Sequence, residues 1–255
     1  MNVSLCFRRR MQLRSLCTLV FAVSVLVPGL SHAADAPDPS VDQIVASALA
    51  KSEADEKNLT RYAYHQKVTF EKLTADGKTD ATSNLEMEVT PGAPSEFTVV
   101  GQKGKVTDEQ QKQAKLSQKF KLTFSLRKMA PRFDVKLDGK ENQKGRTIYR
   151  LAFSPKPDQP FENRVEKISN HFVGTMWVSA DDFSLLKVTA HLDDPVDMAW
   201  ILASMESLDF SYDACPIAGG VAPCRFVIQY RLGFPMVKVR QRNEITMSDY
   251  RIRAQ

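Results

Sequence analysis

The chain has 255 residues and a net charge of +5, which is long enough for one domain with a sizeable core. Its first 33 residues contain Arg8, Arg9, Arg10 and Arg14 and no acidic residue, so without them the net charge falls to +1. A nearly neutral domain lacks the positive charge with which proteins bind nucleic acid, and we expect no nucleic-acid partner.

Residues 1–33 have the pattern of a signal peptide. A basic head precedes the apolar run Leu16–Leu30, and Ser31 and Ala33 are the small residues expected before a cleavage site. The apolar run is shorter than the ~20 residues of a spanning helix, which disfavours the alternative, an uncleaved membrane anchor. We therefore predict cleavage near Ala33, a domain at 34–255, and a soluble periplasmic protein.

The cysteines agree with export. Cys6 and Cys17 leave with the signal peptide, so Cys215 and Cys224 remain as an even pair. A redox or metal site at these cysteines is disfavoured, because they form no C-x-x-C motif and have no histidine nearby in the sequence. We predict a structural Cys215–Cys224 disulfide, which contributes roughly 2–3 kcal/mol in the chain-entropy model.

The N-terminal third predicts one helix followed by strands. Ser40 is a candidate cap for an amphipathic helix over Val41–Lys57. The remaining segments alternate between apolar and polar residues, as half-buried strands do. They are Arg61–Leu73, Thr79–Thr90 and Glu96–Gly101, with a hairpin turn at Asp76-Gly77.

The segment Thr107–Ala130 fits two structures. Thr107 and Gln110 match a capping box, and the residues that follow favour a helix that ends before Pro131. Residues 118–127 also alternate as a strand would, and residues 195–203 leave the same choice open. We favour a helix for most of Thr107–Ala130.

The central block predicts strands and a tight hairpin. We expect strands at Phe133–Leu137 and Thr147–Phe153, a turn at Gly139, and a long polar loop after Ser154. Asn170–Ser179 alternates, and Ala180-Asp181-Asp182 is a turn in which aspartate tolerates the left-handed conformation. The return strand has one apolar face: Leu186, Val188, Ala190 and Leu192.

The C-terminal third is the clearest β region. Apolar residues alternate at 208–212, at 226–232 and at 237–247, with a bend at Gly233 and Pro235. Lys238, Arg240 and Arg242 share the opposite face, which we expect to be the soluble exterior. The fold class is α+β and β-rich: a single curved antiparallel sheet of nine or ten strands, an open half-barrel, with a helical lid.

No motif for catalysis is present. The sequence has no G-x-S-x-G, P-loop, H-E-x-x-H or G-x-G-x-x-G. His171 and His191 lie on facing arms of the predicted hairpin, where a metal site is conceivable, but outward-facing strand residues are the favoured interpretation. Asp193, Asp194 and Asp197 could likewise bind a hard cation, but a solvated acidic turn is the favoured interpretation. We expect no enzyme activity, no metal and no cofactor.

Three stretches resemble a known family. "GRTIYRLAFSPKP", "FVGTMWVSADDFSLLKV" and "ITMSDYR" resemble the outer-membrane lipoprotein-sorting (LolA/LolB-like) superfamily of periplasmic proteins. The best part is Gly174–Val188, which is similar to the family's G-x-x-W-[VI] strand, acidic turn and return strand. The long Thr107–Ala130 segment and the cysteine pair depart from the small carriers of the family.

The resemblance implies a half-barrel groove for lipid or lipoprotein acyl chains and transient membrane contact. The candidate lipid-binding residues are Leu116, Phe120 and Phe124 in the lid and Phe172, Met176 and Val188 in the floor. Two alternatives stay open. The apolar face is an ordinary filled core, or the chain is a periplasmic interaction or envelope-sensor domain that binds a protein partner and transports no lipid.

Overall fold

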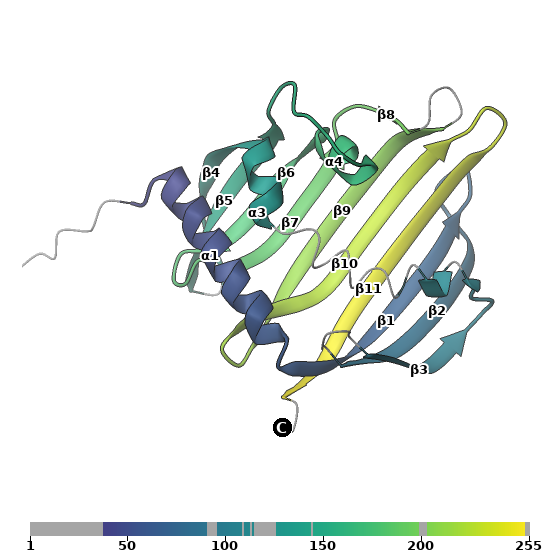
Figure 1. Ribbon diagram of the computed structural model, residues 1–255, viewed down its shortest axis with the longest axis horizontal. Helices are drawn as coiled ribbons and strands as arrows, with labels where there is room; N and C mark the ends of the chain where they lie inside the picture. Colours follow the sequence, from purple (N-terminus) through teal and green to yellow (C-terminus); the bar gives the residue numbers. More distant parts are fainter. Residues whose placement is uncertain are drawn as a thin grey trace, which may run out of the picture. The chain divides into compact units, whose positions relative to one another are not determined.

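The structure is a computed structural model that describes residues 38–90, 96–108, 110–112, 114, 126–143, 145–198 and 203–252. The described residues form one antiparallel sheet of 11 strands, with α1 lying across one of its faces (Figure 1). Along the sheet the order is β3-β2-β1-β11-β10-β9-β7-β6-β5-β4, and the short β8 pairs with β9. β3 and β4 are the two edges of this order, so the sheet is open. The predicted open, β-rich half-barrel is confirmed.

The elements have the following bounds. The helices are α1 (Val41–Leu59), α3 (Leu126–Met129) and α4 (Arg164–Ser169), with a 3-10 turn η1 (Ala130–Arg132). The strands of the first half are β1 (Tyr62–Leu73), β2 (Thr79–Thr90), β3 (Glu96–Lys103), β4 (Phe133–Gln143) and β5 (Arg146–Pro155). The strands of the second half are β6 (Phe172–Ser179), β7 (Leu185–Leu192), β8 (Val196–Asp197), β9 (Ser204–Ile217), β10 (Gly220–Gly233) and β11 (Lys238–Ile252).

α1 begins at a capping box. The Ser40 hydroxyl accepts from the Gln43 amide at 3.3 Å, and the Gln43 side chain accepts from the Ser40 amide at 2.8 Å. These two bonds satisfy amides that a helix start otherwise leaves without a partner. Ile44 and Ala48, on one stripe of the helix, are buried against Tyr149, Leu151, Val178 and Leu185 of the sheet. The face that α1 covers is called the inner face below.

The second capping box is also present. Thr107 and Gln110 exchange side-chain to backbone bonds of 2.9 and 3.2 Å, and the described residues from Asp108 to Ala114 are helical. Residues 115–125, which include most of the stretch that fits either a helix or a strand, lie outside the described residues. The chain is described again from α3, where Arg127 pairs with Glu53 of α1 at 2.7 Å.

Two predictions about the central block are wrong. Gly139 is not a turn: β4 continues to Gln143, and Gly139 (φ +148°) lies at a register shift opposite Arg150. An added residue in one strand of a pair is accommodated as a bulge, and glycine permits the backbone that it needs. The segment after β5, predicted as a long polar loop, contains the helix α4, which is only six residues long and too short to show a clear helical pattern in the sequence. Its cap is Asn163, whose side chain accepts from the Glu166 amide at 3.0 Å.

The predicted hairpin of β6 and β7 is present, but its turn differs in detail. The left-handed residue is Phe183 (φ +58°), whereas Asp182 accepts hydrogen bonds from the Ser184 amide and hydroxyl at 3.1 and 2.7 Å. A register shift after the turn places Leu185, not Leu186, opposite Val178. Leu185 is therefore the buried residue that continues the apolar face of β7 formed by Val188, Ala190 and Leu192.

The Cys215–Cys224 disulfide is confirmed. The two cysteines lie on the paired strands β9 and β10, with their Cα atoms 5.6 Å apart. The turn of this hairpin contacts the end of α1 and the start of β1. The Ala218 carbonyl accepts from the Asn58 amide group at 3.0 Å and from the Tyr62 hydroxyl at 2.7 Å. The disulfide thus braces the hairpin on which the C-terminal end of α1 rests. The other open segment, residues 195–203, contains β8, and residues 199–202 lie outside the described residues.

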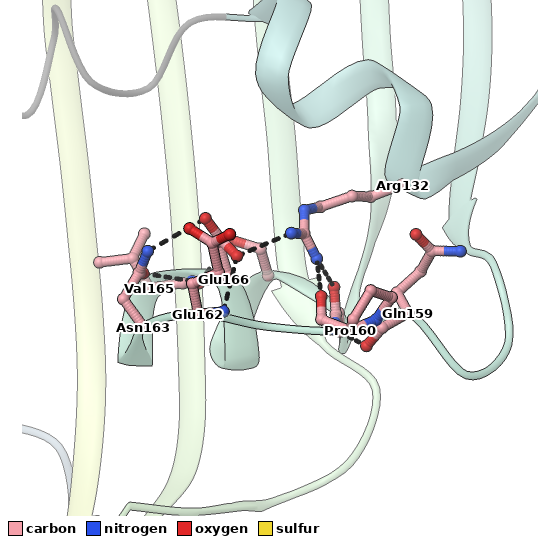
Figure 2. A network of polar contacts seen from close by, with 9 residues as sticks. Arg132, Gln159, Pro160, Glu162, Asn163, Val165 and Glu166 are labelled. Carbon is pink, nitrogen blue, oxygen red and sulfur yellow. Dashed lines mark hydrogen bonds and ion pairs between the residues drawn. The ribbon is translucent and has the colours of Figure 1, made fainter.

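Arg132 holds the connection between β5 and β6 against the end of η1 (Figure 2). Its guanidinium donates to the Pro160 carbonyl at 2.6 Å, to Asn170 Oδ1 at 2.9 Å and to Glu166 Oε2 at 2.7 Å. Glu166 also accepts from the Glu162 amide at 2.9 Å. The hydrogen bond from the Glu162 amide lowers the pKa of Glu166 most. The positive charge of Arg132 lowers it further. Arg132 therefore contacts three points of the connection that contains α4.

Gly174 is required by close packing across β6. A Cβ built on Gly174 would lie 2.1 Å from the Thr189 carbonyl oxygen and 2.6 Å from Cζ of Phe153. The Phe153 ring thus lies directly over the glycine, in a cluster with Phe172 and Ala190. Any side chain at this position would have to displace the ring or the neighbouring strand.

We expect Gly174→Ala to destabilise the fold by about 1–3 kcal/mol, because the extra methyl group overpacks the sheet. Urea unfolding measures the change. The matched control is Gly101→Ala in the edge strand β3, where the added Cβ meets only the Glu86 side chain, at 3.3 Å or more. Equal effects of the two substitutions would contradict the packing argument.

We expect Arg132→Ala to cost about 2 kcal/mol at neutral pH, because it removes three hydrogen bonds, one of them to a carboxylate. Since the folded pKa of Glu166 is lowered, its share of this stability is present above its ordinary pKa and is lost as the pH falls toward the folded value. Urea unfolding of wild type and variant between pH 7 and pH 3 tests this. The difference between the two stabilities should narrow on acidification, because only the bond to Glu166 depends on its charge.

The control for this prediction is Arg150→Ala. Arg150 pairs with Asp138 at 2.8 Å and with Glu141 at 3.0 Å, but its side chain is more exposed than that of Arg132. Exposed pairs contribute about 0–1 kcal/mol, so this variant should be the more stable one. A gap between wild type and Arg132→Ala that does not change with pH would exclude a role for the Glu166 charge.

Candidate functional site

A continuous apolar row crosses the inner face of the sheet. Residues paired directly across antiparallel strands lie on the same face, so the registers of eight neighbouring strands define the row. We call it the apolar row; from β2 to β5 it consists of Leu85, Val68, Ile245, Phe226, Tyr212, Val188, Met176 and Leu151.

Burial along the apolar row is uneven. Its ends, on β1, β2 and β11 and on β5, are fully buried, whereas Phe226, Tyr212, Val188 and Met176 in the middle are only half-buried. Ala114 belongs to the core cluster of β1, β2 and β11. Ile44 and Ala48 of α1 belong to the cluster at the other end. Both ends are therefore covered by helical residues, and the four central side chains are the least buried part of the row.

Aromatic rings gather at this centre. The Tyr212 and Phe226 rings lie 5.1 Å apart between centroids, and Phe210 lies 6.2 Å from Phe226. Burial, and then the negative charges of Asp55 and Asp213, raise the pKa of Tyr212, so its phenol stays neutral at any physiological pH. The centre of the row is thus an uncharged surface suited to apolar or aromatic contact.

A short polar chain borders the row on β10 and β11. The Tyr230 hydroxyl donates to Gln241 Oε1 at 2.8 Å, and Gln241 Nε2 donates to Asn243 Oδ1 at 2.8 Å. Asn243 pairs with Ile228, directly beside the Phe226 position of the apolar row. Burial raises the pKa of Tyr230. These three side chains are neutral hydrogen-bonding groups at one border of an apolar surface.

Asp55 is the charged group that α1 brings to this face. It is buried, pairs with Lys51 and accepts from the Val221 amide at 3.4 Å. Within the described part of the chain, its second oxygen, Oδ2, has no hydrogen-bond partner. Gly220 permits the contact, because a Cβ at that position would fall 3.1 Å from the carboxylate carbon.

The outer face is polar and largely self-paired. Arg242 contacts Glu71 and Glu244 at 2.6 Å each, and Arg225 contacts Glu244 at 2.6 Å. The Arg225 hydrogen bond lowers the pKa of Glu244. Arg242 therefore lies on the face opposite the inner one, as the sequence predicts for Lys238, Arg240 and Arg242.

The structure brings together the floor residues that the sequence predicts. Met176 and Val188 are direct partners in the apolar row, and Phe172 lies on the same face, buried against Phe153 and Ala190. The predicted lid residues Leu116, Phe120 and Phe124 lie outside the described residues. The sequence-based set lacks Phe210, Tyr212 and Phe226; their alternation is visible in the sequence, but the register that joins them to Met176 and Val188 is not.

The described histidines, His65, His171 and His191, do not gather into a metal-binding group. Among the described residues, no group of three or more His, Cys, Asp or Glu side chains is arranged to hold a metal ion. His65 lies on the outer face between two carboxylates, 3.1 Å from Glu88 and 3.9 Å from Glu86. The described helices include none with the length and apolar character of a membrane span.

Several solved structures are similar to this chain. A LolA superfamily protein from Nitrosomonas europaea is 11% identical, with a TM-score of 0.35, and the match covers 86% of this chain and 96% of that one. A DUF1329 family protein from Desulfovibrio piger is 13% identical (TM-score 0.36; 84% and 94% covered). The MucA/MucB complex of Pseudomonas aeruginosa contains a chain that is 12% identical (TM-score 0.25; 82% and 99% covered).

No protein-family model matches the chain, and no curated protein matches it. A member of the superfamily that the sequence resembles is thus among the similar solved structures. Identities of 13% and below and TM-scores of 0.36 and below transfer no ligand, partner or activity to this chain.

Proposed function

We propose that this protein binds lipid or lipoprotein acyl chains on the inner face of its half-barrel, as a carrier or binding protein and not as an enzyme. The observation that carries the proposal is the apolar row. Its ends are covered by helical residues, and its centre, Phe226, Tyr212, Val188 and Met176, keeps accessible apolar surface. An ordinary core would bury the middle of such a row more completely than its ends.

The dimensions of the centre suit a linear chain. The four central side chains come from four adjacent strands, β10, β9, β7 and β6, and strands lie about 4.8 Å apart, so they span about 14 Å. Each methylene group transferred from water to such a surface contributes about 0.8 kcal/mol. The neutral Tyr230–Gln241–Asn243 chain lies where an ester or amide end group would find hydrogen-bonding partners.

The disulfide supports an exported protein, because such bonds form and persist in oxidising compartments. A periplasmic location after cleavage near Ala33 is the matching proposal for the whole chain. In that compartment a lipid carrier makes transient contact with the membrane, and an envelope protein is the alternative partner for the same apolar surface.

We expect the purified protein to bind a fluorescent fatty-acid probe, and Phe226→Ala to weaken that binding severalfold. Because Phe226 is half-buried, the loss of stability should be smaller than the about 3–5 kcal/mol of a fully buried phenylalanine. Probe titration and urea unfolding of the same preparations separate the two effects.

The matched control is Val227→Ala, one residue along β10 and on the outer face, which should bind the probe like wild type. Native mass spectrometry of protein purified from its own periplasm would identify the bound molecule. A large stability loss in Phe226→Ala, with no probe bound by either protein, would assign the row to an ordinary core and favour a domain that binds a protein partner.

A further inference from the structure

The turn between β10 and β11 exposes three large apolar side chains. Gly233 pairs with Lys238 at the end of the hairpin, and the Phe234 amide donates to the Val237 carbonyl at 2.9 Å. We call Phe234–Val237 the apolar turn. In it, Met236 is 94% exposed, Val237 58% and Phe234 42%. Met236 is therefore almost entirely in solvent, on a turn whose backbone is fixed by a hydrogen bond.

Packing does not explain these residues. In the described part of the chain, none of the three belongs to a core cluster. A tight hairpin turn favours Asn, Asp and Gly, which cost nothing in water, whereas exposed apolar groups clustered at one place are typical of an interaction surface. The side chains of the apolar turn therefore do not stabilise the fold of the isolated protein.

Cationic residues flank the apolar turn. Arg231, Lys238 and Arg240 lie within three residues of it. Glu206 lies 2.9 Å from Lys238 and 3.7 Å from Arg231, and the charge of Arg240 contributes to lowering the pKa of Asp76. Arg240 donates to the Ala75 carbonyl in the neighbouring β1–β2 turn, where Asp76 pairs with Lys78. The base of the apolar turn therefore keeps a positive excess and is fastened to the adjacent hairpin.

The same end of the sheet carries further exposed apolar groups. The β10–β11 turn and α4 both lie at the upper end of the sheet in Figure 1. Phe161, just before α4, is 54% exposed, and Val165 within it is 41% exposed. Lys167 lies over the Phe161 ring, 5.6 Å from its centroid. Apolar side chains next to lysine or arginine thus occur at two places along this end.

We propose that the apolar turn is a membrane-docking element, which inserts Phe234, Met236 and Val237 into the interface of an anionic phospholipid bilayer. Apolar side chains reach the acyl boundary while Arg231 and Lys238 meet lipid phosphates, the combination by which peripheral segments bind anionic membranes. A convex turn presents its apolar groups outward, as a planar bilayer interface requires. The proposal stands on this hairpin alone and needs no ligand on the inner face.

Vesicle flotation tests the proposal. Wild-type protein should float with vesicles of phosphatidylethanolamine and phosphatidylglycerol at low salt, and less with phosphatidylcholine alone or at high salt. Met236→Asp should lower the partition coefficient at least about tenfold, because it places a charge in the interface. Lys238→Gln should lower it about fivefold, the effect of one cation near an anionic surface.

The matched control is Val100→Asp in β3, where Val100 is 53% exposed but lies away from the apolar turn. It should float like wild type, and urea unfolding should show that Met236→Asp is as stable as wild type. Absence of wild-type flotation, or equal flotation of Met236→Asp, overturns the proposal. A wild-type dimer that Met236→Asp converts to a monomer, without vesicle binding, would instead assign the turn to a contact between protein copies.

Fatty-acid probe binding separates this proposal from the function proposed for the inner face. Met236→Asp should bind the probe with wild-type affinity, since the turn is not part of the apolar row. If the wild type floats with vesicles but binds no probe, membrane docking stands and acyl-chain binding fails. If the wild type binds the probe but does not float with vesicles, acyl-chain binding stands and membrane docking fails.

Discussion

Cross-strand register is the constraint on which the rest of this structure depends. Side chains alternate between faces at every residue of a strand, so a slip of one residue on any strand would move its apolar set to the outside. The apolar row needs seven consecutive registers to agree. The register shifts fall outside the row, among them those at Ala63/His65, Trp177/Val178 and Pro223/Arg225. The irregularities shape the sheet without interrupting its central apolar surface.

The helix that covers one end of this surface is held by contacts distant in sequence. α1 begins at its own capping box, but its C-terminal end rests on the turn between β9 and β10 through Asn58, and Tyr62 at the start of β1 contacts the same turn. The disulfide closes the same hairpin. Asp55 of α1 is buried against the start of β10, and its charge is balanced by Lys51. The cover of the inner face and the oxidised state of the cysteines are therefore linked by one hairpin.

The sequence predicts which side of each strand is apolar, but it does not predict which strands pair with one another. Alternation places Tyr64, Val68 and Leu85 inside, and Met176 and Val188 on one face, because period two is local information. It does not show that Phe226 and Tyr212 continue the row of Val188, since that depends on which strands are neighbours. Leu185 replaced Leu186 because a single register shift after a turn reverses the pattern. Phe183, not an aspartate, took the left-handed position, with its ring stacked on Tyr149.

The Gly139 bulge has a consequence for how molecules of this kind coexist in solution. In the described sheet β4 is one of the two edges, and an edge strand is a template on which another extended chain can pair. A bulge interrupts the regular spacing of those groups, and the exposed charges of Lys136, Asp138 and Lys140 oppose the approach of a second strand. The residue that extends β4 past the expected turn thus also protects the half-barrel against growing, edge to edge, into an aggregate.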